Sequence, residues 1–386
     1  MKDFSRRNFL YLTGAGALAG GASEGWLQAQ QEIPPAVPAS PIFPYEARSP
    51  VALVKGEDRR KNVTQALAAV DREILPAIKR KKYVVIKINN VSTTNQLAAT
   101  HVDALRGILD YLEPRIKGPV VVVESSAGET LEGFENFKYA QVIPEYKRLH
   151  VSLVDLNRER KYQIFSIVDR NIRPIPVRLA ARMFDPDAYI ISSAMLKTHN
   201  AVVATMSVKN MVIGSPLHSV ANETPAWHDK RLYHARAESG PGGPGSAGRG
   251  GMGGAGRSGV AGNFHAMNYS MAITAKKLST NWGAALIDGF EGMEGNGPST
   301  GTPVPMHVAL ASPDLLAADR VALETMGIPP HAVGYLQYAA ELGVGQFDLA
   351  KIDIRGEKPE SVRRVFKLHD MVQQQFNWLR DLPRPA

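Results

Sequence analysis

Short apolar runs alternate with longer amphipathic segments through most of this 386-residue chain. The runs at residues 51–54, 83–88 and 120–123 have the length of buried strands. The segments between them, 62–78 and 101–112, have the apolar spacing of helices. This alternation predicts an α/β fold with a mainly parallel sheet and helices on both faces. Because ligands of such folds bind beyond the carboxyl ends of the strands, polar residues at those ends are the first candidates for a site.

The same pattern continues after residue 150. Further strands are expected at 151–155, 189–192, 284–287 and 307–311, and further helices at 264–277 and 315–326. Residues 240–262 differ, because they combine repeated Gly with Pro, Ser and Arg and have almost no large apolar side chain. We expect them to form a flexible surface insertion. A phosphate-binding glycine loop would instead need a strand before it and a helix after it at fixed spacing.

We expect one α/β domain over residues 51–360. A proline-rich linker at 30–50 precedes it, and a peripheral or irregular C-terminal segment at 361–386 follows it. The candidate site residues span most of the domain and no linker divides them, so a single domain is favoured over two.

The N-terminal 29 residues have the pattern of a twin-arginine signal peptide. Ser5-Arg6-Arg7-Asn8-Phe9-Leu10 opens an apolar, Gly- and Ala-rich run that ends at Ala22. This predicts export of the folded chain by the twin-arginine translocase to the periplasm or another extracytoplasmic space. Cleavage after Ala29 and retention as an anchor both remain open. No later segment approaches the ~20 apolar residues of a membrane span, so none is expected in the mature form.

Composition excludes several classes of site. The chain has no cysteine, which rules out disulfides, thiolate nucleophiles and Cys-ligated iron–sulfur clusters. The formal net charge of +8 favours acidic partners. The basic residues are scattered and no nucleic-acid-binding motif is present, so no nucleic-acid partner is expected.

The first candidate cluster lies at the end of the expected strand 83–88. Lys87 is followed there by Asn89 and Asn90. A lysine at a strand end can hold a phosphate or carboxylate as a point charge. The alternative is a lysine that reaches past apolar neighbours into solvent.

The second cluster follows the expected strand 189–192. Lys197-Thr198-His199-Asn200 comes first, and Ser207, Lys209 and Asn210 come next. His199 could act as a general base or a metal ligand, and the lysines could bind an anion. The alternative is a hydrogen-bonded histidine with solvated lysines.

The third cluster is an acidic, glycine-rich stretch after the expected strand 284–287. It contains Asp288, Glu291, Glu294 and Asn296. Paired carboxylates can share a proton or hold a divalent cation such as magnesium or calcium. The EF-hand spacing is missing, and a plain acidic turn is the alternative.

Two weaker sets remain. His228, His234 and His265 flank the glycine-rich insertion, but they lack the H-x-x-x-H spacing of a zinc site. Glu124 and Ser125 end another strand and could add a carboxylate and a hydroxyl. No G-x-S-x-G sequence surrounds Ser125, which argues against a hydrolase triad.

These segments together resemble the family called domain of unknown function 362. Val85-Ile86-Lys87-Ile88-Asn89, Ala194-Met195-Leu196-Lys197-Thr198-His199 and Ser207-Val208-Lys209-Asn210 are similar to its motifs, as are Val51-Ala52-Leu53-Val54-Lys55-Gly56 and residues 288–303 and 311–319. The resemblance implies an α/β fold and, in many members, an attached ferredoxin-type cluster domain. This chain departs from that branch because it has no cysteine. The family has no established general activity.

The leading hypothesis is an exported enzyme acting on a small anionic molecule, a carboxylate or a phosphate. We assign catalysis to Lys197, His199 and Glu294, substrate binding to Lys87, Asn89, Lys209, Asn210 and Asn296, and a divalent metal to Asp288 and Glu291. The alternative is a non-catalytic protein that binds a metal or cofactor loaded before export. An interaction protein that uses the proline-rich and glycine-rich segments is a third hypothesis, but no motif supports it.

Overall fold

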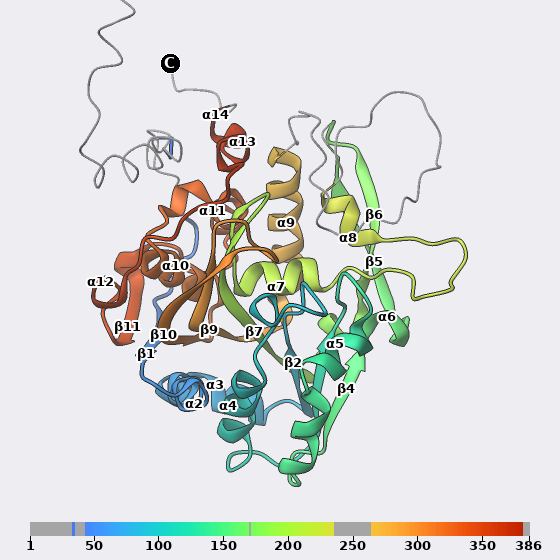
Figure 1. Ribbon diagram of the computed structural model, residues 1–386, viewed down its shortest axis with the longest axis vertical. Helices are drawn as coiled ribbons and strands as arrows, with labels where there is room; N and C mark the ends of the chain where they lie inside the picture. Colours follow the sequence, from blue (N-terminus) through green and yellow to red (C-terminus); the bar gives the residue numbers. More distant parts are fainter. Residues whose placement is uncertain (1–32, 35–42, 170, 235–263, 381–386) are drawn as a thin grey trace, which may run out of the picture.

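The computed structural model describes residues 33–34, 43–169, 171–234 and 264–380 (Figure 1). Its main sheet is built from β1 (Ser49–Lys55), β2 (Tyr83–Lys87), β3 (Val120–Glu124), β4 (Val151–Asp155), β7 (Ala188–His199), β8 (Val203–Thr205), β9 (Trp282–Glu294), β10 (Thr302–Ser312) and β11 (Ile352–Gly356). The strand order is β11-β1-β10-β9-β7-β2-β3-β4, and β8 pairs with β7. On this path only β10 is antiparallel to its neighbours. The predicted α/β fold with a mainly parallel sheet is confirmed.

Helices cover both faces of the sheet. One face carries α2 (Arg59–Ala69), α3 (Asp71–Lys79) and α4 (Val102–Leu112), and the other carries α7 (Ser207–Gly214), α9 (Phe264–Leu278), α10 (Leu315–Met326) and α11 (Gly334–Glu341). Successive strand residues point to opposite faces. In β2, Val84 and Ile86 therefore join the core under α2 and α4, whereas Val85 joins the core under α7 and α9. The buried apolar runs of the sequence thus supply two cores at once.

Several elements differ from the sequence-based expectation. The helix expected at 62–78 is two helices that meet at Val70. A hairpin of β5 (Tyr162–Val168) and β6 (Pro174–Ala180) was not predicted, and neither were β8 and β11. The remaining short helices are α5 (Thr130–Asn136), α6 (Leu156–Glu159), α8 (Asp229–Tyr233), α12 (Pro359–Val362), α13 (Val372–Gln375) and α14 (Asn377–Arg380).

Two central strands are much longer than predicted. β7 continues to His199 and is buried along its whole length, so Lys197 and His199 lie inside a strand and not after it. β9 continues to Glu294, so the expected acidic turn is also strand. A Cβ at Gly289 would lie 2.6 Å from Leu196 Cδ1 and 2.7 Å from Val308 Cγ2. Gly289 therefore allows close packing between strands. The sequence pattern had suggested a glycine of a turn.

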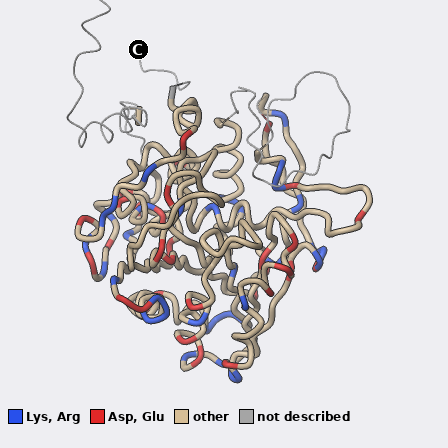
Figure 2. The backbone as a smooth tube through the Cα atoms, in the orientation of Figure 1, with Lys and Arg blue, Asp and Glu red and all other residues tan. Residues whose placement is uncertain are grey.

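Lys and Arg positions are interspersed with Asp and Glu positions along the described backbone (Figure 2). In the part of the chain that the structure describes, no helix is long and apolar enough to cross a membrane. The predicted signal peptide at 1–29, nearly all of the linker before residue 43 and the insertion at 240–262 lie outside the described residues.

Candidate functional site

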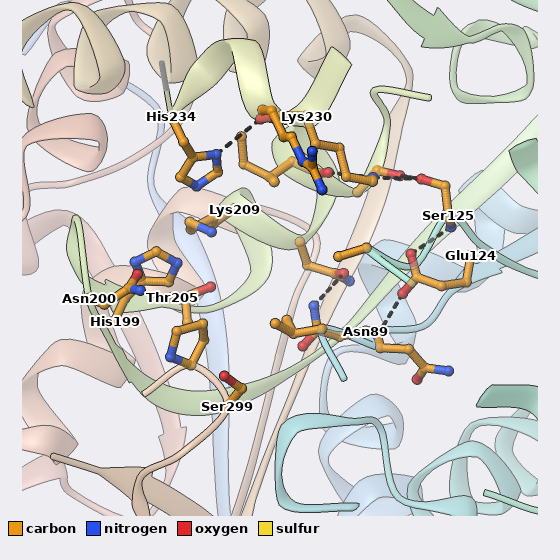
Figure 3. A pocket seen from close by; sticks show the side chains of 18 of the residues that line it. Asn89, Glu124, Ser125, His199, Asn200, Thr205, Lys209, Lys230, His234 and Ser299 are labelled. Carbon is orange, nitrogen blue, oxygen red and sulfur yellow. Dashed lines mark hydrogen bonds between the residues drawn. The ribbon is translucent and has the colours of Figure 1, made fainter. Parts of the chain in front are cut away.

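A cavity of about 230 Å³ opens where β2, β3 and β7 end, beneath α7 and α8 (Figure 3). Its polar lining comprises Lys87, Asn89, Asn90, Glu124, Ser125, His199, Asn200, Thr205, Lys209, Asn210, His228, Lys230, Arg231, His234 and Ser299. This is the position that the parallel-sheet rule predicts for a ligand site. The volume is below the roughly 300–1,000 Å³ of pockets for drug-sized ligands, so the cavity suits a small molecule.

The floor of the cavity is a buried ion pair. Lys87 Nζ lies 2.6 Å from Glu124 Oε1, and both side chains are almost fully buried. Lys87 also donates to Ile88 O at 2.6 Å and to Asn210 Oδ1 at 3.2 Å. Glu124 further accepts the backbone N–H groups of Ser125 and Asn90, both at 2.7 Å. Burial lowers the pKa of Lys87, and Glu124 acts in the opposite direction. All three amine donors of Lys87 are thus used within the protein.

The close approach of α7 to Lys87 depends on a glycine. A Cβ at Gly214, the last residue of α7, would lie 2.5 Å from both Cε and Nζ of Lys87. Any larger residue at this position would have to displace the Lys87 amine. Gly214 therefore belongs to the construction of the site.

A chain of amides connects the buried lysines. Lys197 Nζ donates to Asn89 Oδ1 at 2.6 Å, and Asn89 Nδ2 donates to Asn210 Oδ1 at 3.1 Å. Asn210 Nδ2 donates in turn to Lys87 O at 3.0 Å. Lys197 does not line the cavity, so its direct effect is to orient Asn89. Burial, and then the charge of Lys209, lowers the pKa of Lys197 to about 7.

Lys209 and Lys230 line the cavity but differ in their contacts. Lys230 Nζ donates to Ser125 Oγ and to Ile213 O, both at 2.7 Å. Lys209 Nζ has no hydrogen-bond or ion-pair partner among the described residues, although only 6% of the residue is exposed. Burial lowers the pKa of each lysine to about 7. Two amines with spare donors therefore face the same small space.

The hydrogen bonds of two histidines define their tautomers. His199 Nδ1 accepts the N–H of Ala201 at 3.0 Å, and His234 Nδ1 donates to the carbonyl of Lys230 at 3.0 Å. Burial and Lys209 hold the pKa of His199 well below its usual range and lower the pKa of His234 to about 4. Both rings are therefore neutral at pH 7. His199 carries its proton on Nε2, and His234 has a lone pair on Nε2.

The helix that carries Lys209 and Asn210 is capped from another element. Its N-cap residue, Met206, has no side-chain acceptor. Asp319 of α10 instead accepts the N–H groups of Ser207 at 2.8 Å and Val208 at 3.0 Å. Burial raises the pKa of Asp319 to about 8, and the two N–H donors oppose that shift.

The acidic candidates lie outside the cavity. Glu294 accepts the N–H of Lys367, and Asn296 hydrogen-bonds with Asp370, so both bind the C-terminal segment. Asp288 is buried beside Arg59 with Nε and Oδ2 at 3.3 Å, whereas Glu291 is exposed. Within residues 33–34, 43–169, 171–234 and 264–380, no group of three or more His, Cys, Asp or Glu side chains could hold a metal ion. The metal role of Asp288 and Glu291 stays a prediction.

The structure thus brings together only part of the predicted set. Lys87, Asn89, His199, Lys209 and Asn210 line one cavity, and Lys197 lies directly behind it. His228 and His234 also line it, whereas His265 contacts Tyr338. Sequence reasoning missed Lys230, Arg231 and Asp319. Lys230 and Arg231 follow no predicted strand. In the sequence, only their position between His228 and His234 could have pointed to the site.

Comparison with known proteins identifies a family but no activity. The model of the Domain of unknown function (DUF362) matches residues 84–324. No curated protein matches the chain. A structural-genomics crystal structure of a protein from Thermotoga maritima aligns with a TM-score of 0.38 and 11% identity over 75% of this chain. The present chain spans 60% of that protein, and the likeness carries no functional argument.

Proposed function

This chain belongs to the DUF362 family, whose function is unknown, and we propose that it is an enzyme acting on a small anionic molecule, a carboxylate or a phosphate. One observation carries the proposal. The Lys209 amine is buried against the cavity with no partner in the described part of the chain. A buried ammonium without a partner is costly, so an anionic ligand would be its natural counter-ion.

The other charges of the cavity support an anion over a cation. Glu124 is the one carboxylate in the described lining, and it already accepts three hydrogen bonds from Lys87, Asn90 and Ser125. Lys230 uses two of its three amine donors within the protein, which leaves one for a ligand. Arg231 adds a further positive charge to the lining.

Neutral histidines beside these lysines support catalysis over simple binding. His199 offers an N–H at Nε2, and His234 offers a lone pair at Nε2. In one cavity, the acceptor can take a proton from a bound ligand, and the donor can stabilise negative charge on it or give it a proton. The predicted catalytic roles of Lys197 and Glu294 are revised in the proposal, since neither residue lines the cavity.

The test is ligand-induced stabilisation of the mature protein by phosphate, lactate and malonate. A binding anion should stabilise the fold by about 2.7 kcal/mol at about 100 times its Kd. Because the pKa values of Lys197, Lys209 and Lys230 lie near 7, these amines lose their protons as the pH rises through 7. For lactate, whose carboxylate stays ionised over this range, the shift in melting temperature should therefore be larger about one pH unit below 7 than about one unit above it.

A matched pair of variants localises the effect. Lys209→Met should remove most of the anion-induced shift, whereas Lys351→Met, which alters a lysine on the surface, should retain it. If no anion in the panel shifts the melting temperature of the wild-type protein at either pH, the proposed function is wrong.

We also propose an extracytoplasmic setting, on the evidence of Arg6 and Arg7 before the apolar run. Expressed with an active twin-arginine translocase, the protein should appear outside the cytoplasm with a new N-terminus after Ala29. Mass spectrometry of the exported protein measures that terminus. An Arg6→Lys/Arg7→Lys variant should stay inside the cell, and export of that variant would refute this route.

A further inference from the structure

We propose that Lys209 is a nucleophilic amine that forms an imine with the carbonyl carbon of a small oxo acid. The inference rests on the proposed function and narrows its substrate class to aldehydes or ketones that carry a carboxylate. It assigns to Lys209 a covalent role, whereas the proposed function requires only a charge.

Four lysines lie at or directly behind the cavity, and the amines of three of them hydrogen-bond within the protein. Lys87 binds Glu124, Ile88 O and Asn210. Lys197 binds Asn89 and Ala98 O, and Lys230 binds Ser125 and Ile213 O. Among the residues that the structure describes, Lys209 Nζ alone of these four has no partner. Its lone pair is therefore available when the amine is neutral, and burial makes the neutral form accessible near pH 7 by lowering its pKa.

Two histidines flank this amine, one with a hydrogen-bond donor and the other with an acceptor at Nε2. The rings of His199 and His234 are stacked with centroids 6.4 Å apart, and Figure 3 shows Lys209 between them. Lys209 is close enough for its charge to lower the pKa of both rings. His199 presents an N–H and His234 presents a lone pair, as their Nδ1 hydrogen bonds require. Imine formation needs both, because an amine proton must be removed while charge develops on the carbonyl oxygen.

The reaction balances with these groups alone. Lys209 Nζ attacks the carbonyl carbon, a C–N bond forms, and the π electron pair moves to oxygen, where the His199 N–H stabilises it. His234 Nε2 takes one amine proton and passes it to that oxygen, which gives a carbinolamine. The second amine proton then follows the same route as the C–O bond breaks and the C=N bond forms. The products are the imine and one water.

The carboxylate of the oxo acid has its own partner. The third N–H of Lys230 is unused, and Arg231 lines the same cavity. Both cations belong to α8, whereas Lys209 belongs to α7. A carboxylate held on one side would leave the adjacent carbonyl carbon free to meet Lys209.

The experiment is reductive trapping on the mature wild-type protein. Pyruvate, glyoxylate or 2-oxoglutarate is added with sodium cyanoborohydride, and modified lysines are located by peptide mass spectrometry. We expect a stable adduct on Lys209 with the mass of the oxo acid less one water plus two hydrogens. Lactate, which has a hydroxyl in place of the carbonyl of pyruvate, should compete with trapping but form no adduct.

The controls separate the imine from the anion site. Lys209→Arg keeps a charge but removes the nucleophile, so it should lower the adduct yield at least about tenfold. Lys351→Arg, a change on the surface, should not alter it. If lactate stabilises the wild-type protein but no oxo acid is trapped on Lys209, or trapping occurs on Lys87, Lys197 or Lys230 instead, the imine is refuted and the anion site stands. If neither an oxo acid nor any of phosphate, lactate and malonate stabilises the protein, the anion site fails together with the imine.

Discussion

Replacing Glu124 with alanine is expected to lower the free energy of unfolding by about 3–5 kcal/mol, because it leaves the Lys87 amine buried without its counter-ion. The change also removes the acceptor for two buried N–H groups, those of Asn90 and Ser125. Urea denaturation followed by circular dichroism measures the loss.

A surface ion pair of the same residue types provides the matched control. Lys351 Nζ and Glu46 Oε2 lie 2.7 Å apart, but most of the Glu46 side chain is exposed. Glu46→Ala should therefore change stability only slightly, since exposed pairs contribute little. The double variant Lys87→Met/Glu124→Gln should recover part of the loss, because no unpaired charge remains. A Glu124→Ala protein as stable as Glu46→Ala would contradict the importance of the buried pair.

Asp319→Ala should cost at least about 2 kcal/mol, since it leaves the N–H groups of Ser207 and Val208 buried without an acceptor. It should also weaken anion binding, although Asp319 does not line the cavity, because those two residues begin the helix that carries Lys209. Urea denaturation and an anion titration by calorimetry measure the two effects.

An ordinary helix cap serves as the control. Asp58 caps α2 by accepting the N–H of Lys61 at 3.1 Å on the surface. Asp58→Ala should cost about 1 kcal/mol or less and leave anion binding unchanged. If Asp319→Ala binds the anion with wild-type affinity, α7 does not need this cap to position Lys209.

The fold was predictable because apolar periodicity reports strands and helices directly. The helix expected at 315–326 has the bounds of α10, and every predicted strand corresponds to an observed one. The strand ends were harder to predict, since Lys197 and Asp288 look like loop residues. Their partners, Asn89 and Arg59, come from distant segments and allow them to stay buried within strands.

The site was predictable in part for the same reason. Lys87, His199 and Lys209 were found because they lie near strand ends on the chain, and the sheet brings those ends together. Lys230 lies on a short helix after a long connection, where no periodic pattern marks it. The contact between Asp319 and Ser207 joins residues 112 positions apart, and no local signal reports such a distance.

The cap on α7 bears on how ligand preference could change during evolution. Helix N-termini commonly hold anions through backbone N–H groups, which among single substitutions only proline removes. Here the Asp319 carboxyl already accepts two N–H groups at that helix end. A ligand must then be held by side chains such as Lys209 and Lys230, each of which can be exchanged by a single mutation. The scaffold could therefore be inherited intact while the molecule it recognises diverges from one descendant to the next.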